Sequence, residues 1–281
     1  MSHTIDSTAS DWAPVVPRPA TAVSEARLQL HQAAQVANAA AISYLEPAAD
    51  DSHTNFGWSA DLRAFVSRRV SLPKPLRFAW RPADFALLAL DDAGTVATLG
   101  LAGHTLDQAH RWARGQCEAA GGDGGRYTAR KHYEIPAHAV AAGANFSADS
   151  GATGMLSELW SNASRFLDAF ARSTPGSSEV RLWPHHFDQG LIVEIDAARS
   201  IGCGFTPGDH YYDEPYWYMS PYPQPAPGAR PVLAGGAHWH ETDFVSAVLP
   251  WSAFAGSVSQ GAAVAAYLRM ALQGARSLLG V

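Results

Sequence analysis

The fold is decided around residues 183–195, Trp-Pro-His-His-Phe-Asp-Gln-Gly-Leu-Ile-Val-Glu-Ile. Here a polar segment with two histidines and an aspartate runs directly into an apolar segment of strand-forming residues. On an extended chain alternate side chains share a face, so we expect His186 and Asp188 on one face and His185 and Phe187 on the other. The stretch therefore predicts a strand that begins with reactive side chains.

Helices and strands are expected in clusters on both sides of this stretch. Apolar spacing, caps and stops predict helices near residues 25–45, 105–120, 155–172 and 259–279, with Thr105 as an N-cap and Gln108 three residues on. Strand patterns predict an antiparallel meander over residues 61–101 with a hairpin turn at 92–94. Further strands are expected near residues 131–135, 179–183, 190–195, 200–205, 216–220 and 244–249. Clustered strands separated by about four helices predict an α+β fold of mostly antiparallel sheets.

The chain is expected to form one domain preceded by an arm. Residues 1–24 contain three prolines and no sustained apolar period, which indicates an N-terminal arm, and residues 25–281 form the single α+β domain. A strand, a turn, a strand and a capped helix describe both 84–120 and 243–279. A pseudo-repeat with halves 25–150 and 151–281 would place two similar lobes around a central crevice.

Composition and charge narrow the classes of partner. With 281 residues, 47% of them hydrophobic, the chain can bury a sizeable core. Its net charge of -6 provides no positive field for nucleic acid. No tract reaches the ~20 apolar residues of a membrane span. The N-terminus lacks the basic and apolar regions of a secretory signal, so a cytoplasmic location is expected, with Cys117 and Cys203 as buried free thiols.

A second histidine cluster follows the Gly235-Gly236 turn. In His238-Trp239-His240-Glu241 the two histidines share one face of an extended chain. Two imidazoles and a carboxylate from neighbouring strands form a facial metal site that leaves coordination positions open. We therefore expect His186, Asp188, His238 and His240 to bind a divalent metal ion, iron or zinc.

Between the two clusters lies a segment rich in aromatic rings with polar tips. Such residues suit the wall of a pocket for a small-molecule substrate. The expected substrate-binding residues are Tyr211, Tyr212, Tyr216, Trp217, Tyr218 and, from the earlier Asp50-Asp51-Ser52-His53 segment, His53. His210 or Glu214 would be the acid/base group.

Three functions remain open at this point. The first is a metal-dependent enzyme acting on a small organic molecule, by oxygenase-type or hydrolytic chemistry. The second is a metal-free enzyme in which Asp188 orients His186 as a general base. The third is a non-catalytic binding module for a small ligand or a protein, with an aromatic pocket. A plain structural role, with His186 and Asp188 hydrogen-bonded beneath a sheet end, competes with all three. Homodimerisation through the terminal helix is also open.

Several joined motifs resemble a known family. They are Asp-Asp-Ser-His-Thr-Asn at 50–55, Arg-Leu-Trp-Pro-His-His-Phe-Asp at 181–188, Arg-Ser-Ile-Gly at 199–202, Pro-Gly-Asp at 207–209, Glu-Pro-Tyr-Trp-Tyr at 214–218 and His-Trp-His at 238–240. From the first helix to the last, the chain resembles a family of uncharacterised bacterial proteins classed as a domain of unknown function. The resemblance implies membership and no particular reaction.

Two better-known families share fragments of the pattern. Iron- and 2-oxoglutarate-dependent oxygenases are similar in outline to His186, Asp188 and a distal His238 or His240, but the arginine that usually follows is missing here. The next arginine is Arg269. Cupins place a glutamate a few residues after His-Xaa-His, whereas Glu241 is adjacent to His240.

Overall fold

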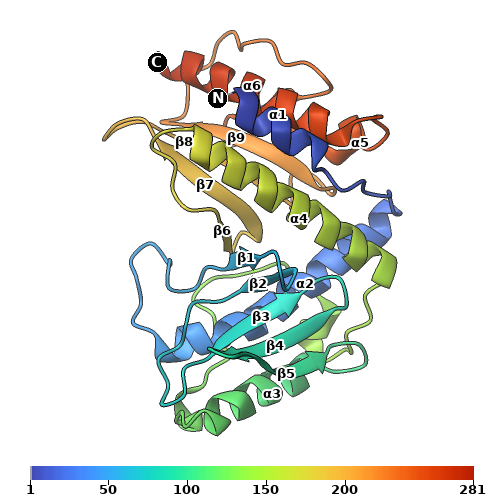
Figure 1. Cartoon of the computed structure of the whole chain (residues 1–281), viewed down its shortest axis with the longest axis vertical. Coiled ribbons are helices and arrows are strands. Elements are labelled where there is room, and N and C mark those ends of the chain that lie inside the picture. Colours follow the sequence, from blue (N-terminus) through green and yellow to red (C-terminus); the bar gives the residue numbers. More distant parts are fainter. Residues whose placement is uncertain (1) are drawn as a thin grey trace. The chain divides into compact units, whose positions relative to one another are not determined.

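The computed structural model describes residues 2–281 and has the α+β architecture that the sequence predicts, with helices and two antiparallel sheets (Figure 1). The chain forms two compact units. Unit 1 comprises the chain up to Pro17, Glu158–Val180 and Asp188–Val281. Unit 2 comprises Arg18–Ser157 and Arg181–Phe187. The two pseudo-repeated lobes suggested by the sequence are not confirmed.

Unit 2 contains the expected meander. Its strands are β1 (Gly57–Ser59), β2 (Ala64–Val66), β3 (Arg77–Arg81), β4 (Ala86–Asp91) and β5 (Gly94–Gly100), and they pair in sequence order. The β4–β5 turn forms where it was predicted. The Asp91 carboxylate accepts hydrogen bonds from the backbone N–H groups of Ala93 (2.8 Å) and Gly94 (3.0 Å). The short strand β6 (Arg181–Trp183) also belongs to unit 2, and Leu182 pairs with Phe56 beside β1.

Two long helices pack with this sheet. α2 (Ala20–Tyr44) is alanine-rich and buried all round from Gln29 to Ala41, and its polar residues in this stretch form hydrogen bonds with the segments packed around it. α3 (Leu106–Ala119) begins with the predicted capping box of Thr105 and Gln108. Trp112 on α3 packs edge-on against Phe78 of β3, with ring centroids 6.2 Å apart. Two short 3₁₀ helices, η1 (Gly124–Arg126) and η2 (Ala139–Ala142), follow α3.

The strand predicted at residues 131–135 does not form. This segment is irregular. Its central residue, Tyr133, donates a hydrogen bond to Gln35 (2.7 Å) and accepts one from Asn38 (3.0 Å), both on α2. Side-chain hydrogen bonds to α2 therefore hold this segment, and it does not form the backbone hydrogen bonds to a neighbouring strand that the prediction required.

Unit 1 is a sheet with helices on one face. The strands β7 (Asp188–Glu194), β8 (Ser200–Thr206), β9 (Tyr216–Tyr222), β10 (His238–His240) and β11 (Ser246–Pro250) lie in the order β10-β11-β9-β8-β7. Trp217 of β9 packs against Phe166 of α4 (Ser150–Ser173), and Tyr267 of α6 (Gln260–Leu279) donates to the backbone carbonyl of Ala247 (2.8 Å). A short helix, α5 (Trp251–Phe254), joins β11 to α6.

The N-terminal arm is more ordered than the sequence indicated. Ser2–Ser10 form α1, which contacts α6 (Figure 1). Trp12 follows, and its indole N–H donates to Gln260 (2.9 Å) while its ring packs edge-on against Phe166 (5.4 Å). Buried Ile5 and Val15, together with hydrogen bonds from the backbone of Ala13 and Val15 to Asn162 and Gln260, also hold the segment against unit 1, although the segment has no apolar repeat.

Within residues 2–281, no helix is both long enough and apolar enough to cross a lipid bilayer.

Candidate functional site

The stretch from Trp183 to Asp188 does not have the extended backbone assumed for it. Residues 184–187 form a turn, and Phe187 has a left-handed φ of 62°. The parity that placed His186 and Asp188 on one face therefore fails. His186 belongs to unit 2 and is exposed, whereas Asp188 begins β7 in unit 1 and accepts a hydrogen bond from Tyr218.

The four predicted metal ligands do not form a metal centre. Among the described residues there is no group of three or more histidine, cysteine, aspartate or glutamate side chains placed to hold a metal ion. His238 and His240 do share a face of β10, as the alternation predicted, opposite Val248 and Ser246 of β11. Their ring nitrogens, however, have other partners.

Tyr212 lies between these two histidines. Its hydroxyl oxygen is 3.0 Å from His238 Nε2 and 3.0 Å from His240 Nδ1, and His240 Nε2 is 2.7 Å from the carbonyl oxygen of Thr242. A carbonyl can only accept, so in neutral His240 the proton is on Nε2 and Nδ1 accepts from the Tyr212 hydroxyl. His238 Nε2 then donates to the Tyr212 oxygen. Both nitrogens of His240 are thus engaged, and the tyrosine clamps the 207–215 loop to β10.

The remaining residues of the aromatic segment divide between core and surface. Trp217 and Tyr216 are buried, and Tyr216 donates to Asp209 (2.5 Å). Tyr211 and Tyr212 stay partly exposed, and the Tyr211 ring contacts His240, with centroids 4.9 Å apart. The predicted aromatic residues are therefore divided: Tyr216 and Trp217 are buried in the core, whereas Tyr211 and Tyr212 remain partly exposed.

The predicted acid/base residues, Glu214 and His210, make contacts with neighbouring residues of the fold. Glu214 accepts hydrogen bonds from the backbone N–H (2.6 Å) and the hydroxyl (2.9 Å) of Ser252 in α5. His210 is exposed, and its ring lies against Tyr211, with centroids 3.8 Å apart. Glu214 therefore anchors the 207–215 loop to α5.

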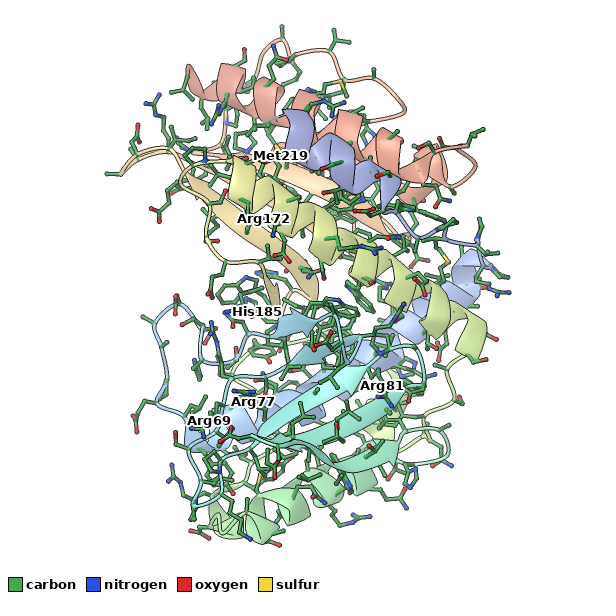
Figure 2. The ribbon with its side chains drawn as sticks, viewed as in Figure 1. Arg69, Arg77, Arg81, Arg172, His185 and Met219 are labelled. Carbon is green, nitrogen blue, oxygen red and sulfur yellow. The ribbon has the colours of Figure 1, made fainter. Side chains whose placement is uncertain are left out.

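A different group of imidazoles comes together in unit 2. Three segments distant in sequence meet there: the loop after α2, the irregular segment after η1 and the turn after β6, where His185 is labelled in Figure 2. We call this group the imidazole cluster. It consists of Asp51, His53, His132, Tyr133, His185 and His186.

The members of the imidazole cluster form a continuous series of contacts. His132 Nε2 is 2.8 Å from Asp51 Oδ1, and the His132 ring is roughly parallel to His53, with centroids 6.4 Å apart. Tyr133 lies 4.9 Å from His132 and 5.4 Å from His185. His185 in turn contacts His186, with centroids 4.3 Å apart. Because the carboxylate only accepts, Asp51 fixes His132 with its proton on Nε2.

Polar side chains of α2 position the turn that carries His185. His31 Nε2 (2.8 Å) and Gln35 Nε2 (2.9 Å) both bind the carbonyl oxygen of Pro184. The His31 ring stacks on Phe187 at 4.4 Å, and Phe187 also stacks on Trp80 at 5.3 Å. Burial lowers the pKa of His31 to about 4, so this histidine is a neutral hydrogen-bond donor at neutral pH.

Burial also lowers the pKa of two histidines within the imidazole cluster. The pKa of His185 is lowered, mainly by desolvation and then by the neighbouring His186. The pKa of His53 is lowered by desolvation as well. His185 Nδ1 is buried and has no hydrogen-bond partner among the residues that the structure describes. Both rings therefore favour the neutral form, which can accept a proton.

Sequence reasoning found only part of this cluster. It singled out His53 and His186, but it placed His185 on the opposite face of the strand and did not single out His132 or His138. The structure gives His132 the partner Asp51, and His138 the partner Glu25 (3.0 Å). The sequence feature that could have pointed to this cluster is the Asp-Asp-Ser-His motif at 50–53. Its partners lie some 80 and 130 residues later, which local spacing cannot connect.

Comparison of the chain with protein-family models, curated proteins and solved structures gave no match in any of the three. The resemblance to an uncharacterised bacterial family therefore stays a prediction.

Proposed function

We propose that the protein is an enzyme that performs metal-free acid–base chemistry on a small organic molecule at the imidazole cluster. Hydrolysis or isomerisation is the class of reaction. The observation that carries the proposal is the Asp51–His132 hydrogen bond, formed between segments 81 residues apart and placed among three further histidines.

The two halves of an acid–base pair can be assigned within the cluster. Asp51 orients His132 and fixes its tautomer with the proton on Nε2. His185 is the second group, because its pKa is lowered and its buried Nδ1 lacks a partner among the described residues. Groups in different surroundings can hold different protonation states at one pH, as acid–base catalysis requires.

A metal ion has no role in this proposal. The sequence predicted iron or zinc on His186, Asp188, His238 and His240, and the described residues contain no suitable group of ligands. His240 would also have to give up a hydrogen bond to bind a metal. The hydrogen bonds made by these histidines support a site of oriented imidazoles rather than a metal centre.

The test uses p-nitrophenyl acetate, an ester whose hydrolysis is assisted by accessible neutral imidazole. We expect the folded protein to hydrolyse it faster than the urea-unfolded chain does. Asp51→Asn, His132→Gln and His185→Gln should each lower the rate at least tenfold, because acid–base catalysis by a positioned side chain contributes about 10²–10⁴-fold. The acid limb of the pH–rate profile should lie below pH 6.5, because the pKa of His185 is lowered and its basic form persists there.

A matched control exists in the same unit. His138 pairs with Glu25 but makes none of the ring contacts of the imidazole cluster. Glu25→Gln and His138→Gln should leave the rate unchanged, provided circular dichroism shows that the variants are folded. Equal rates for the cluster variants and these controls would refute the proposed function.

A further inference from the structure

Three polar residues of α2 share one face of the helix. His31, Gln35 and Asn38 follow one another at spacings of four and three residues, which makes them neighbours on a helix surface. All three are buried. Two segments that belong to no strand, residues 130–137 and 184–187, are bound to this face by hydrogen bonds from its side chains.

The hydrogen-bond directions around Gln35 follow from its partners. Its Nε2 lies 2.9 Å from the carbonyl oxygen of Pro184 and 3.2 Å from that of His31, and carbonyl oxygens only accept. The amide nitrogen therefore faces both carbonyls, and the amide oxygen accepts from the Tyr133 hydroxyl (2.7 Å). Burial raises the pKa of Tyr133, so this hydroxyl keeps its proton. Both polar atoms of the Gln35 side chain are thus engaged.

Of the three side chains, Gln35 is the one that binds both segments. His31 binds the Pro184 carbonyl (2.8 Å), and Asn38 donates to the Tyr133 hydroxyl (3.0 Å). Gln35 bonds to both of these groups through the two ends of one planar amide. Neither segment can shift relative to the other without breaking a buried hydrogen bond, so the amide sets their separation.

The two groups that Gln35 joins are chain neighbours of the proposed acid–base pair. Tyr133 directly follows His132, and Pro184 directly precedes His185. The Tyr133 ring also contacts both imidazoles, at centroid distances of 4.9 Å and 5.4 Å. We propose that Gln35 is a positioning residue, which holds His132 and His185 in fixed relative positions and keeps His185 packed against Tyr133. This inference rests on the proposed function, because it assigns Gln35 a role in that acid–base pair.

Loosening this link should change two properties of the pair. His132 and His185 would sample a wider range of separations, and a misplacement of about 1 Å can cost about 10²-fold in rate. Water would also reach His185, whose pKa is lowered mainly by desolvation and then by His186, while Asp51 raises it and His132 lowers it. Restored hydration should bring that pKa back up toward its ordinary value of about 6.5.

The main variant is Gln35→Met, which keeps an unbranched side chain of similar length and removes its hydrogen bonds. We expect kcat for p-nitrophenyl acetate to fall about tenfold with KM changed less than about twofold, and the acid limb of the pH–rate profile to move up toward pH ~6.5. Proton NMR titration of the His185 ring measures the same pKa without any substrate. Gln29→Met is the matched control and should leave all three unchanged. Gln29 lies on the same helix, is buried, and uses its amide on Glu25 (2.8 Å) and Ser147 (2.8 Å), outside the imidazole cluster.

Tyr133→Phe is the second variant, should Gln35→Met fail to fold. It keeps the ring and removes only the hydroxyl that donates to Gln35, so it should shift the rate and the His185 pKa in the same directions. An unchanged His185 titration in the folded variant would overturn the inference, and so would an equal loss of rate in the Gln29→Met control. A folded wild-type chain that hydrolyses the ester no faster than the unfolded chain would instead refute the proposed function. The His185 titration would still decide whether Gln35 fixes this histidine.

Discussion

Tyr218 lies flat across two glycines of the neighbouring strands. A Cβ at Gly204 would lie 2.4 Å from the Tyr218 hydroxyl oxygen and 2.6 Å from its ring carbon Cζ, and a Cβ at Gly190 would lie 2.5 Å from that oxygen. The hydroxyl donates to Asp188, and burial raises the pKa of this tyrosine far above its usual value. Glycine is required at both positions because the ring occupies the space of a side chain, and the backbone carbonyl oxygens of Gln189 (2.6 Å from a Cβ at Gly204) and Cys203 (2.9 Å from a Cβ at Gly190) narrow it further.

The Gly204→Ala substitution should therefore destabilise unit 1. Its methyl group would push Tyr218 away from Asp188, and overpacking of this kind costs about 1–3 kcal/mol. Gly202→Ala on the same strand is the matched control, since its nearest neighbour would be the Ser220 carbonyl oxygen at 3.9 Å. Urea denaturation followed by tryptophan fluorescence measures both variants. Equal losses at the two positions would show that the ring is not what excludes a side chain.

Individual histidines illustrate how the same residue type takes different roles. His31 is buried, stacked and neutral, and it holds the Pro184 carbonyl. His240 is also buried, with both nitrogens engaged. His185 keeps a buried nitrogen without a partner among the described residues, which is why it is the second group of the proposed acid–base pair.

Among the elements, α3 is the one whose start the sequence predicts most directly. Thr105 Oγ1 accepts from the Gln108 N–H (3.2 Å), and the Thr105 N–H donates to Gln108 Oε1 (2.8 Å). Two backbone donors that a helix start leaves unpaired are satisfied in this way. The capping box could be predicted because all of its atoms lie within four consecutive residues.

Thr105→Ala should lower the free energy of unfolding by about 1 kcal/mol, the usual cost of losing an N-cap. Thr105→Ser keeps the accepting hydroxyl and should retain most of that stability. Thermal denaturation followed by circular dichroism at 222 nm gives the comparison. A serine variant as unstable as the alanine variant would mean that the threonine methyl group, and not the cap, stabilises this position.

The strand at residues 131–135 shows where prediction of elements fails. The segment was expected to be a strand, but a strand needs a neighbouring strand with which to form backbone hydrogen bonds. Tyr133 instead bonds to Gln35 and Asn38. Tertiary contacts outweighed local propensity in this segment.

At the scale of the whole molecule, unit 2 depends on a segment from the second half of the chain. Arg181–Phe187 return to it after α4, and Phe187 is only 2% exposed between His31 and Trp80. Apart from the chain up to Pro17 and Arg181–Phe187, the two units divide close to the boundary between the predicted halves, 25–150 and 151–281, while the repeat itself is not confirmed.

Phe187→Ala should weaken unit 2 in particular. Removing a buried phenylalanine costs about 3–5 kcal/mol, so hydrogen–deuterium exchange should accelerate most in peptides of residues 18–157. Phe205→Ala is the matched control, because Phe205 is equally buried in unit 1 and contacts Trp217. Its effect should fall mainly on residues 188–281. The assignment of 181–187 to unit 2 would be contradicted if Phe187→Ala acted mainly on residues 188–281.

The sequence alone determined the features that depend on neighbouring residues: the α+β class, the meander with its turn at Asp91–Gly94, the cap at Thr105 and the shared face of His238 and His240. Only the tertiary structure decided which histidines meet. The turn at Phe187 separates the faces of His186 and Asp188, and α2 draws together segments around residues 51, 132 and 185. The reason is physical: local patterns fix backbone conformation over a few residues, whereas a site is made by side chains that long-range packing brings together.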